Sequence, residues 1–561
     1  MSVSAAAAPG EVVYAARGLS KRFGPIEACR AVDLDIRHGR LTAIVGDNGA
    51  GKSTLVKMLT GALQPDAGRL VLRGREAHFA SPLDARRQRV EVVYQELALA
   101  PNLDAISNIF LGRELTRPVM GLPVLRRLDE ARMRDLAREE IRRLNVKIPS
   151  IRGVPVGKLS GGQQQSVAIA RAAFWTTDVL FMDEPTAALG VQEARAVLDL
   201  VRTILDRGVA VVMVSHILPH VLELADHVVV MRHGEIREDG PAKQVFEAPR
   251  DSYTKALLKC RPQLEHRPMR LPVIDDFMNG SPRAAADAAD RKRGVKPGDP
   301  IVLDVKNLGK SFYSREGLFG SREFKAVKDV SFELRKGKTL GLVGESGSGK
   351  TTVGLTLMRL HEATTGEAIF EGKDLLSMSA KDFMPYKRRI QIIFQNPYAS
   401  LNPRFTVGAI LTEPMMIHGI GANAQERTDL AFELLTKVGL PEVSFYKYPH
   451  EFSGGQRQRI AVARCLTMKP DILICDESVS ALDVSVQAQV LNLLQDLQDE
   501  YDLSYIFISH DLAVVKYISD QVMVMNEGEI VEIANSDEIY RDPKMPYTQK
   551  LLASIPKGFA S

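Results

Sequence analysis

The chain reads Gly46-Asp47-Asn48-Gly49-Ala50-Gly51-Lys52-Ser53-Thr54 near its start and Gly344-Glu345-Ser346-Gly347-Ser348-Gly349-Lys350-Thr351-Thr352 past its middle. Each stretch follows a short apolar run of strand length. A strand, a glycine-rich loop and a helix in this order bring backbone N–H groups, a lysine and a hydroxyl to the phosphates of a nucleotide. We therefore predict two phosphate loops in an α/β chain. The predicted ATP ligands are Gly46, Asn48, Gly49, Gly51, Lys52, Ser53 and Thr54 in the first loop and Gly344, Ser346, Gly347, Gly349, Lys350, Thr351 and Thr352 in the second.

The two loops belong to a much longer repeat. Lys52 and Lys350 are 298 positions apart, and the later landmarks Asp183 and Asp476 are 293 apart. Such a period is too long for a solenoid and indicates duplication of a whole domain. The predicted boundaries are a flexible N-terminus at 1–11, a first unit at 12–260 with a helical subdomain near 96–175, a linker at 261–300, a second unit at 301–555 with a helical subdomain near 396–467, and a tail at 556–561.

The segment 261–300 is rich in proline and contains the basic cluster Arg291-Lys292-Arg293. Many prolines and few aromatic residues are typical of a poorly ordered linker. We expect the basic cluster to be a solvated charge without a function of its own.

The composition limits the class of partner. The chain has 73 Lys and Arg residues against 69 Asp and Glu, a formal net charge of +4, which does not indicate nucleic-acid binding. Apolar runs are too short to cross a membrane, and residues 1–10 do not resemble a secretory signal. The four cysteines form no CxxC pair, which favours reduced thiols in a cytosolic compartment.

An apolar run that ends in two acids also occurs twice, at Asp183-Glu184 and at Asp476-Glu477. The end of a strand directs the first carboxylate toward a magnesium ion on the nucleotide, and the second can accept a proton from an attacking water. We predict ATP hydrolysis with Glu184 and Glu477 as bases. The predicted magnesium ligands are Asp183 with Ser53 in the first unit and Asp476 with Thr351 in the second.

Between these motifs lie Ser160-Gly161-Gly162-Gln163 and Ser453-Gly454-Gly455-Gln456. A serine and two glycines that open a helix form a second anion-binding end in a unit that already has a phosphate loop. The N-terminus of this helix would have a role if it bound the ATP of the opposite unit. The motif set resembles that of the ATP-binding cassette family over both units. The resemblance implies two tandem P-loop nucleotide-binding domains, each with a RecA-like core sheet, in which Lys52 faces Ser453 across one ATP and Lys350 faces Ser160 across the other.

The resemblance also implies roles for residues outside these motifs. Gln95 and Gln395 match the family's glutamine loop, which contacts magnesium or water and adjoins the transmembrane partner. His216 and His510 match its switch histidine. Adenine in this family stacks on an aromatic residue before the phosphate loop, for which Phe23 and Tyr313 are the candidates, with Phe312 competing with Tyr313.

The halves differ. Asp483 matches the family's D-loop aspartate, whereas the first unit has Gly190 there, so we predict unequal hydrolysis at the two sites.

The first half resembles the ATPases of bacterial simple-sugar importers. The second, with Phe394-Gln395-Asn396-Pro397, resembles those of oligopeptide and dipeptide importers, and its tail motif Pro546-Tyr547-Thr548 agrees. Tyr253-Thr254 repeats part of that tail motif in the first half, which favours peptides there too.

We interpret the chain as the ATPase subunit of a bacterial importer at the cytoplasmic face of the inner membrane. It would use ATP and Mg²⁺ and drive two separate permease subunits, which a periplasmic or lipid-anchored solute-binding protein supplies with a peptide or an oligosaccharide.

The alternative is a soluble twin-cassette factor that acts on the ribosome. That group typically reads Asp-Glu-Pro-Thr-Asn-His-Leu-Asp after the acidic strand, unlike either half of this chain. A DNA-repair ATPase of the family would require zinc-type cysteine pairs or a long coiled coil, and the sequence has neither.

Overall fold

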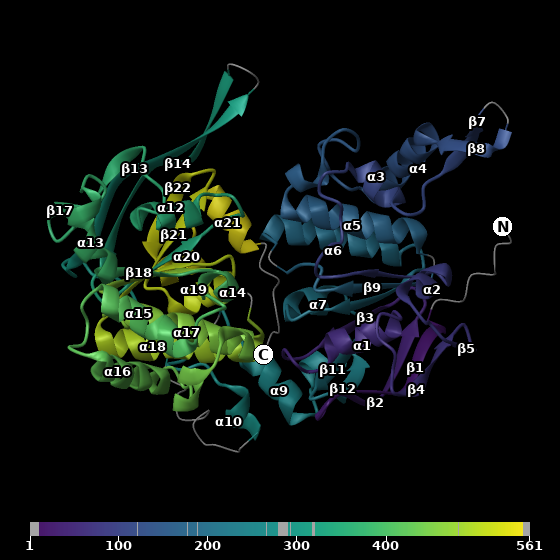
Figure 1. The fold of residues 1–561 in the computed structure, drawn as a ribbon, viewed down its shortest axis with the longest axis horizontal. Helices are drawn as coiled ribbons and strands as arrows, with labels where there is room; N and C mark the ends of the chain where they lie inside the picture. The colour runs from purple at the N-terminus through teal and green to yellow at the C-terminus, as the bar shows by residue number, and fades with distance from the viewer. Residues whose placement is uncertain are drawn as a thin grey trace. The chain divides into compact units, whose positions relative to one another are not determined.

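A computed structural model describes residues 10–119, 122–176, 178–187, 189–264, 266–278, 290–291, 293–316, 320–480 and 482–553. The described residues divide into two compact units, one that ends at Leu258 and one that begins at Lys259 (Figure 1). The predicted N-terminal segment 1–11 lies mostly outside the described residues, and the predicted tail 556–561 lies wholly outside them.

The core sheet of the first unit has the strand order β12-β11-β3-β10-β9-β6. Its strands are parallel except for β12, which pairs antiparallel with β11. β3 and β10 are buried along their whole length, as expected for strands covered on both faces. This explains why they read as uninterrupted apolar runs. The strands are β12 (Glu235–Pro241), β11 (His227–Arg232), β3 (Leu41–Val45), β10 (Ala210–Val214), β9 (Val179–Asp183) and β6 (Val90–Val93).

A second sheet and a set of helices complete the first unit. The sheet is antiparallel, with the order β2-β1-β4-β5, and Tyr14 on β1 is fully buried in the core beside Phe181 of β9. The predicted helical subdomain 96–175 holds α3, α4 and α5, and also a hairpin, β7–β8, that the sequence did not predict. The elements are β1 (Val12–Phe23), β2 (Ile26–Arg37), β4 (Ala67–Leu72), β5 (Arg75–Ala77), β7 (Thr116–Val119), β8 (Leu122–Leu128), α1 (Lys52–Leu59), α2 (Pro82–Arg87), α3 (Ala105–Phe110), α4 (Glu130–Arg143), α5 (Gly161–Trp175), α6 (Val191–Leu205), α7 (Leu218–Leu224), α8 (Ala242–Glu247) and α9 (Ser252–Lys259).

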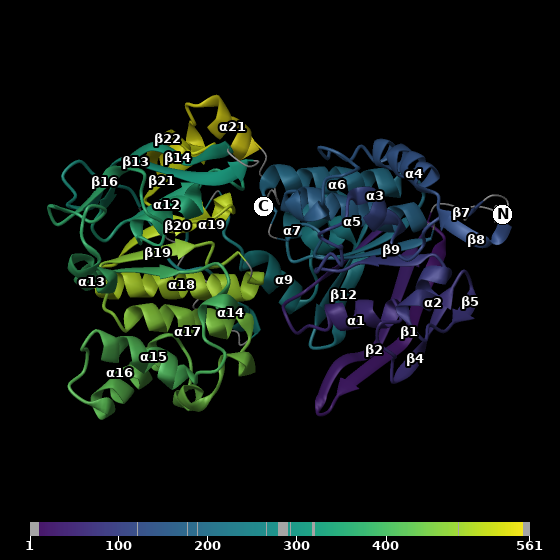
Figure 2. The ribbon, with the colours of Figure 1, turned by 45° about the horizontal axis from the view of Figure 1, so that its top comes forward.

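The second unit repeats this architecture, with a core sheet in the order β18-β19-β20-β15-β21-β22 and an antiparallel sheet in the order β14-β13-β16-β17. In Figure 2, α18 and α17 and then α15 and α16 lie in successive layers on one side of β19. The strands are β13 (Ile301–Glu316), β14 (Gly320–Arg335), β15 (Thr339–Val343), β16 (Thr365–Phe370), β17 (Lys373–Asp374), β18 (Ile390–Ile393), β19 (Ile472–Asp476), β20 (Ser504–Ile508), β21 (Gln521–Asn526) and β22 (Glu529–Asn535). The helices are α12 (Lys350–Leu357), α13 (Ala380–Arg389), α14 (Pro397–Ser400), α15 (Val407–Ile417), α16 (Ala424–Lys437), α17 (Gly454–Leu466), α18 (Val484–Tyr501), α19 (Leu512–Ile518), α20 (Ser536–Arg541) and α21 (Pro546–Ala553).

The described part of segment 261–300 packs on the second unit, so the prediction of a poorly ordered linker is wrong there. It includes a short helix, α10 (Ile274–Met278). The backbone N–H of Leu271 donates to Asn492 Oδ1 of α18 (2.9 Å), and Asn492 Nδ2 donates to the Leu271 carbonyl (2.8 Å). Buried backbone N–H and C=O groups require hydrogen-bond partners, and in this irregular segment the Asn492 side chain supplies them.

The expectation of a solvated basic cluster is also wrong for its described members. The Arg293 side chain is 3% exposed and pairs with Asp520, Nη1 to Oδ2 3.4 Å. Arg291 pairs with Asp499 of α18. Buried charges require partners, and these carboxylates supply them. Lys292 lies outside the described residues.

Candidate functional site

The phosphate loop of the first unit connects β3 to α1. Gly46, Gly49 and Gly51 have φ angles of 146°, 81° and 101°, in the region that favours glycine. A Cβ on Gly46 would lie 2.2 Å from the carbonyl oxygen of Met231, so no other residue fits there. Lys52 begins α1, is 6% exposed, and its Nζ donates to the carbonyls of Gly46 (2.6 Å) and Asp47 (2.8 Å). The loop thus has the backbone path and the cation that phosphates require.

The second phosphate loop has the same construction between β15 and α12. Gly344 has a φ of 151°, and a Cβ there would meet the carbonyl oxygen of Met525 at 2.2 Å. Lys350 Nζ donates to the carbonyls of Gly344 (2.9 Å) and Glu345 (2.8 Å). Burial lowers the pKa of Lys350, while the charges of Glu477, Asp476 and Glu345 oppose the shift.

Each acidic strand end meets the first turn of the helix after the phosphate loop. Thr351 Oγ1 donates to Asp476 Oδ1 (2.9 Å), and the Ser53 side chain hydrogen-bonds Asp183. Burial raises the pKa of both aspartates, and the neighbouring glutamate charges raise it further. A hydroxyl and a carboxylate in contact form an oxygen donor set that suits Mg²⁺, which takes few protein ligands beside phosphate oxygens.

The predicted catalytic residues of the first unit come together at Glu184. This residue follows β9 with a φ of 51°, and its backbone N–H donates to the Val214 carbonyl at the end of β10 (2.9 Å). Gln95 Nε2 donates to Glu184 Oε2 (3.2 Å), and His216 Nδ1 lies 3.1 Å from Glu184 Oε1. Residues from three separate strand ends therefore converge on one carboxylate.

The second unit gathers the same three side chain types. Glu477 has a φ of 45°; its Oε2 accepts from Gln395 Nε2 (2.6 Å), and its Oε1 lies 3.4 Å from His510 Nδ1. A left-handed backbone is costly for a residue other than glycine and asparagine, and its recurrence in both units indicates that it aims the carboxylate.

Electrostatics keep both glutamates ionised. Burial raises the pKa of Glu477, but the hydrogen bond and charge of His510 and the charge of Lys350 outweigh it, so the pKa lies below its ordinary value. His216 and Lys52 do the same for Glu184. Conversely, burial lowers the pKa of His510, but Glu477 brings it above the ordinary value. An ionised carboxylate at neutral pH is the form that accepts a proton.

The signature motifs cap helices rather than joining the phosphate loop of their own unit. Ser160 is the N-cap of α5: its Oγ accepts from the Gln163 backbone N–H (3.4 Å), and Gln163 Oε1 accepts from the Ser160 N–H (3.1 Å). Ser453 and Gln456 form the same capping box on α17. Gly161, Gly162, Gly454 and Gly455 form the first turns of these helices.

The structure changes the choice of aromatic residue in the second unit. Ser20 of β1 pairs with Ala67 of β4, and Gly309 of β13 pairs with Thr365 of β16, so Ser20 and Gly309 hold equivalent positions. Phe23 lies three residues after Ser20, and Phe312 lies three residues after Gly309. Phe312 is therefore the counterpart of Phe23. A lysine ammonium lies over each ring, 5.9 Å from Phe23 and 4.9 Å from Phe312. Neighbouring residues of a strand face opposite sides, so Tyr313 faces away from this position. The comparison of the units assigns Phe312, not Tyr313, as the equivalent aromatic.

Two tyrosines beside the phosphate loops were not predicted as site residues. Tyr253 of α9 is fully buried, and its hydroxyl accepts from the Asp47 backbone N–H (2.9 Å) and hydrogen-bonds the Asp47 carboxylate. The Tyr547 hydroxyl of α21 accepts from the Glu345 N–H (3.4 Å). The repeated tyrosine-threonine pair in the sequence was the signal that could have identified them.

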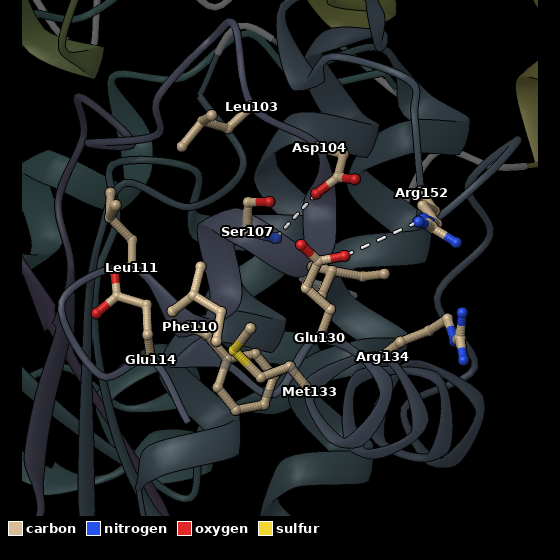
Figure 3. A pocket seen from close by; sticks show the side chains of 12 residues that line it. Leu103, Asp104, Ser107, Phe110, Leu111, Glu114, Glu130, Met133, Arg134 and Arg152 are labelled. Carbon is tan, nitrogen blue, oxygen red and sulfur yellow. Dashed lines mark hydrogen bonds and ion pairs between the residues drawn. The ribbon is translucent and has the colours of Figure 1, made fainter. Parts of the chain in front are cut away.

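A pocket of about 450 Å³ lies in the helical subdomain of the first unit (Figure 3). Phe110 of α3 and Met133 of α4 line it, and Asp104 caps α3 by accepting from the Ser107 N–H (2.9 Å). Leu103, Leu111 and Leu128 at this pocket are 37%, 49% and 49% exposed. None of the predicted ATP ligands lines it.

Within the part of the chain that the structure describes, no helix is both long enough and apolar enough to span a membrane.

Comparisons with known proteins agree with this geometry. The ABC transporter family matches residues 29–187 and 327–480, one match in each unit. The C-terminal region of oligopeptide and dipeptide transporters matches residues 238–279 and 531–558, so both halves carry it. The resemblance of the first half to sugar importers finds no support among these matches.

Relatives that align with most of the chain carry a more specific name. Glutathione import ATP-binding protein GsiA of Salmonella typhimurium is 39% identical over 553 residues, and that of Escherichia coli is 39% identical over 558. Each alignment covers 95% of this chain and 87% of the relative. Solved structures include a dimeric bacterial ABC transporter cassette, MJ0796, with 26% identity, a TM-score of 0.38 and coverage of 42% of this chain and 98% of that one. Another is cbiO1 from Clostridium perfringens, with 25% identity, a TM-score of 0.38 and coverage of 43% and 92%. These TM-scores add no weight to the assignment.

The paired family matches and the relatives aligned over nearly the whole chain agree with two phosphate loops, two acidic strand ends and two signatures. The chain belongs to the ABC transporter family and is an ATP-binding cassette ATPase.

Proposed function

We propose that the chain is the ATP-hydrolysing subunit of a peptide importer, bound peripherally to two permease subunits at the cytoplasmic face of the inner membrane. A periplasmic or lipid-anchored solute-binding protein would deliver the solute to those permeases. The observation that carries the proposal is the likeness to glutathione import ATP-binding proteins over 95% of the chain, together with a glutamate that accepts a hydrogen bond from a glutamine in each unit.

ATP would bind each phosphate loop, with Lys52 or Lys350 at its phosphates. Magnesium, held by Ser53 with Asp183 or by Thr351 with Asp476, would neutralise phosphate charge. Glu184 and Glu477 accept a proton from the attacking water, since each carboxylate is ionised at neutral pH. The histidine and glutamine beside each glutamate fix its orientation and hold the water.

The signature serines Ser160 and Ser453 make their hydrogen bonds at the starts of their own helices, and Ser160 also donates to Glu193. Within the described residues, neither serine hydrogen-bonds the glutamate, histidine or glutamine that lie together in its own unit. We propose that each signature completes the ATP site of the opposite half, so Ser453 serves Lys52 and Ser160 serves Lys350. Phe23 and Phe312 would stack on the adenines, a contact that any base can make.

A short peptide or a peptide-like thiol is the proposed substrate class. The peptide-transporter region follows the cassette in both halves, which supports peptides over the oligosaccharide that the first half suggested. The ribosome-bound alternative has no support from the relatives, whose printed names describe import.

The pocket in Figure 3 is the proposed contact for one permease. Exposed leucines around a concave surface are typical of a protein interface. Leu111 is half exposed and contributes to this rim, so a charge there disturbs the contact without opening the core.

Affinity purification of the tagged Glu184→Gln, Glu477→Gln variant from detergent-solubilised membranes tests the proposal. We expect ATP to retain two integral membrane subunits, identified by mass spectrometry. Adding Leu111→Glu should lower their recovery, whereas Leu83→Glu, at a leucine of similar exposure on α2, should not. Recovery of ribosomes without permeases would overturn the proposal.

A further inference from the structure

The signature of the first unit carries an extra carboxylate. Ser160 Oγ donates to Glu193 Oε1 (2.8 Å), and Glu193 Oε2 accepts from the Gly190 backbone N–H (3.3 Å). Glu193 lies in the first turn of α6, which packs beside α5 (Figure 1). One carboxylate therefore connects the signature serine to the position where the first unit lacks the D-loop aspartate.

The second unit has a valine at the same place. Glu193 and Val486 are 293 positions apart, as are the catalytic glutamates. A Cβ on Gly162 would lie 2.6 Å from Glu193 Cβ, and one on Gly455 would lie 2.1 Å from Val486 Cγ1. The Glu193 and Val486 side chains therefore lie at equivalent positions, each close to the first turn of the signature helix of its own unit. Ser453 Oγ accepts from the Gln456 N–H (3.4 Å), and within the described residues it donates to no carboxylate.

This difference changes what the first signature offers to an anion. The start of α5 has the positive end of the helix dipole, unpaired N–H groups and one hydroxyl proton. In the first unit that proton is donated to Glu193, and a negative charge already stands beside Ser160. A terminal phosphate that approached Ser160 would have to break this bond and would meet a like charge. Ser453 imposes neither cost.

We propose that Glu193 is the residue that makes the two ATP sites unequal. Its carboxylate occupies the first signature and lowers the ATP affinity of the site that Lys350 and Ser160 form. The inference rests on the proposed pairing of each signature with the opposite phosphate loop. It discriminates between nucleotides, because ADP has no γ-phosphate to meet the carboxylate.

The test measures Mg-ATP and Mg-ADP binding to the full chain by equilibrium dialysis, with Glu184→Gln and Glu477→Gln present to stop hydrolysis. We expect two ATP affinities in this parent. Glu193→Gln keeps the shape and removes the charge, and should tighten the weaker one at least about fivefold, the effect of one nearby like charge even in bulk water. Val486→Glu is the reciprocal variant and should weaken the stronger affinity. ADP binding should change in neither.

Two further variants locate the effect. Adding Lys350→Ala should abolish the gain from Glu193→Gln, whereas adding Lys52→Ala should preserve it. Unchanged ATP affinity in Glu193→Gln, or an equal change for ADP, would overturn the inference while leaving the importer proposal intact. Loss of the gain with Lys52→Ala instead would overturn the pairing on which the inference rests. A parent that bound no ATP would contradict the proposed function itself.

Discussion

At the scale of single residues, Tyr253 and Tyr547 connect the last helices of each unit to its phosphate loop. Tyr253→Phe removes a buried hydroxyl that bonds both the backbone and the side chain of Asp47. A buried group left unpaired costs about 1–3 kcal/mol, so we expect ATP affinity at the first loop to fall about fivefold or more. The measurement is ATP binding with Lys350→Ala present to silence the second loop.

The matched control is Tyr547→Phe, measured with Lys52→Ala. Its bond to Glu345 is longer, 3.4 Å, and Tyr547 is less buried than Tyr253, so the loss should be smaller. Wild-type affinity in Tyr253→Phe would show that the tyrosine is only a packing residue.

His510 and Glu477 predict a pH dependence of stability. The folded-state pKa of His510 is raised by Glu477, so its contribution is complete below the unfolded value of about 6.5 and is lost as pH rises through the folded pKa. The folded-state pKa of Glu477 is lowered, so its contribution is lost only as pH falls through that lowered pKa. The pair is therefore most stabilising at weakly acid pH.

Thermal unfolding of wild type and His510→Gln between pH 5 and 9 checks this. The difference in unfolding free energy should be largest below about pH 6.5 and should shrink as the pH rises. A difference that is constant or grows with pH would contradict the assigned charge on His510.

At the scale of elements, the segment before the second unit is part of that unit's structure. Asn492 of α18 satisfies both the N–H and the carbonyl of Leu271 in a buried position. Asn492→Ala should lower the free energy of unfolding by about 2 kcal/mol, because two buried backbone groups lose their partners. Asp496→Ala removes an exposed ion pair with Arg270 on the same helix and should cost less than about 1 kcal/mol. Urea denaturation compares the two; equal losses would mean that the segment is not held by these bonds.

The elements show how far sequence reasoning reaches. The strands before both phosphate loops and both acidic pairs were predictable to within a residue or two, because they are short apolar runs that end at a conspicuous motif. The β7–β8 hairpin was missed because its arginine-rich second strand does not alternate clearly. The packed segment was missed because Arg293 and Arg267 are buried through contacts with residues more than 200 positions away, which no local pattern reveals.

The positions of the candidate site residues were predictable where each residue belongs to a conspicuous motif. Glutamates 184 and 477, their histidines and their glutamines lie together as the motif order implied. The contact of Glu193 with Ser160 was not predictable, since it joins two helices through side chain geometry. The register of β13, which its partner strands set, places Phe312 rather than Tyr313 at the position that Phe23 has in the first unit.

At the scale of the whole molecule, we propose that one chain forms two ATP sites, each completed by the signature of the other half. Paired variants test it directly. If Lys52 pairs with Ser453, then Lys52→Ala with Ser453→Ala damages one site twice and leaves the other whole. Lys52→Ala with Ser160→Ala damages both sites.

The measurement is the number of ATP molecules retained per chain after rapid gel filtration, in the Glu184→Gln, Glu477→Gln background that prevents hydrolysis. We expect the Lys52→Ala, Ser453→Ala variant to retain about one ATP per chain and the Lys52→Ala, Ser160→Ala variant to retain almost none. The reverse result, with ATP retained only when Ser160 and Lys52 are lost together, would contradict the proposed pairing.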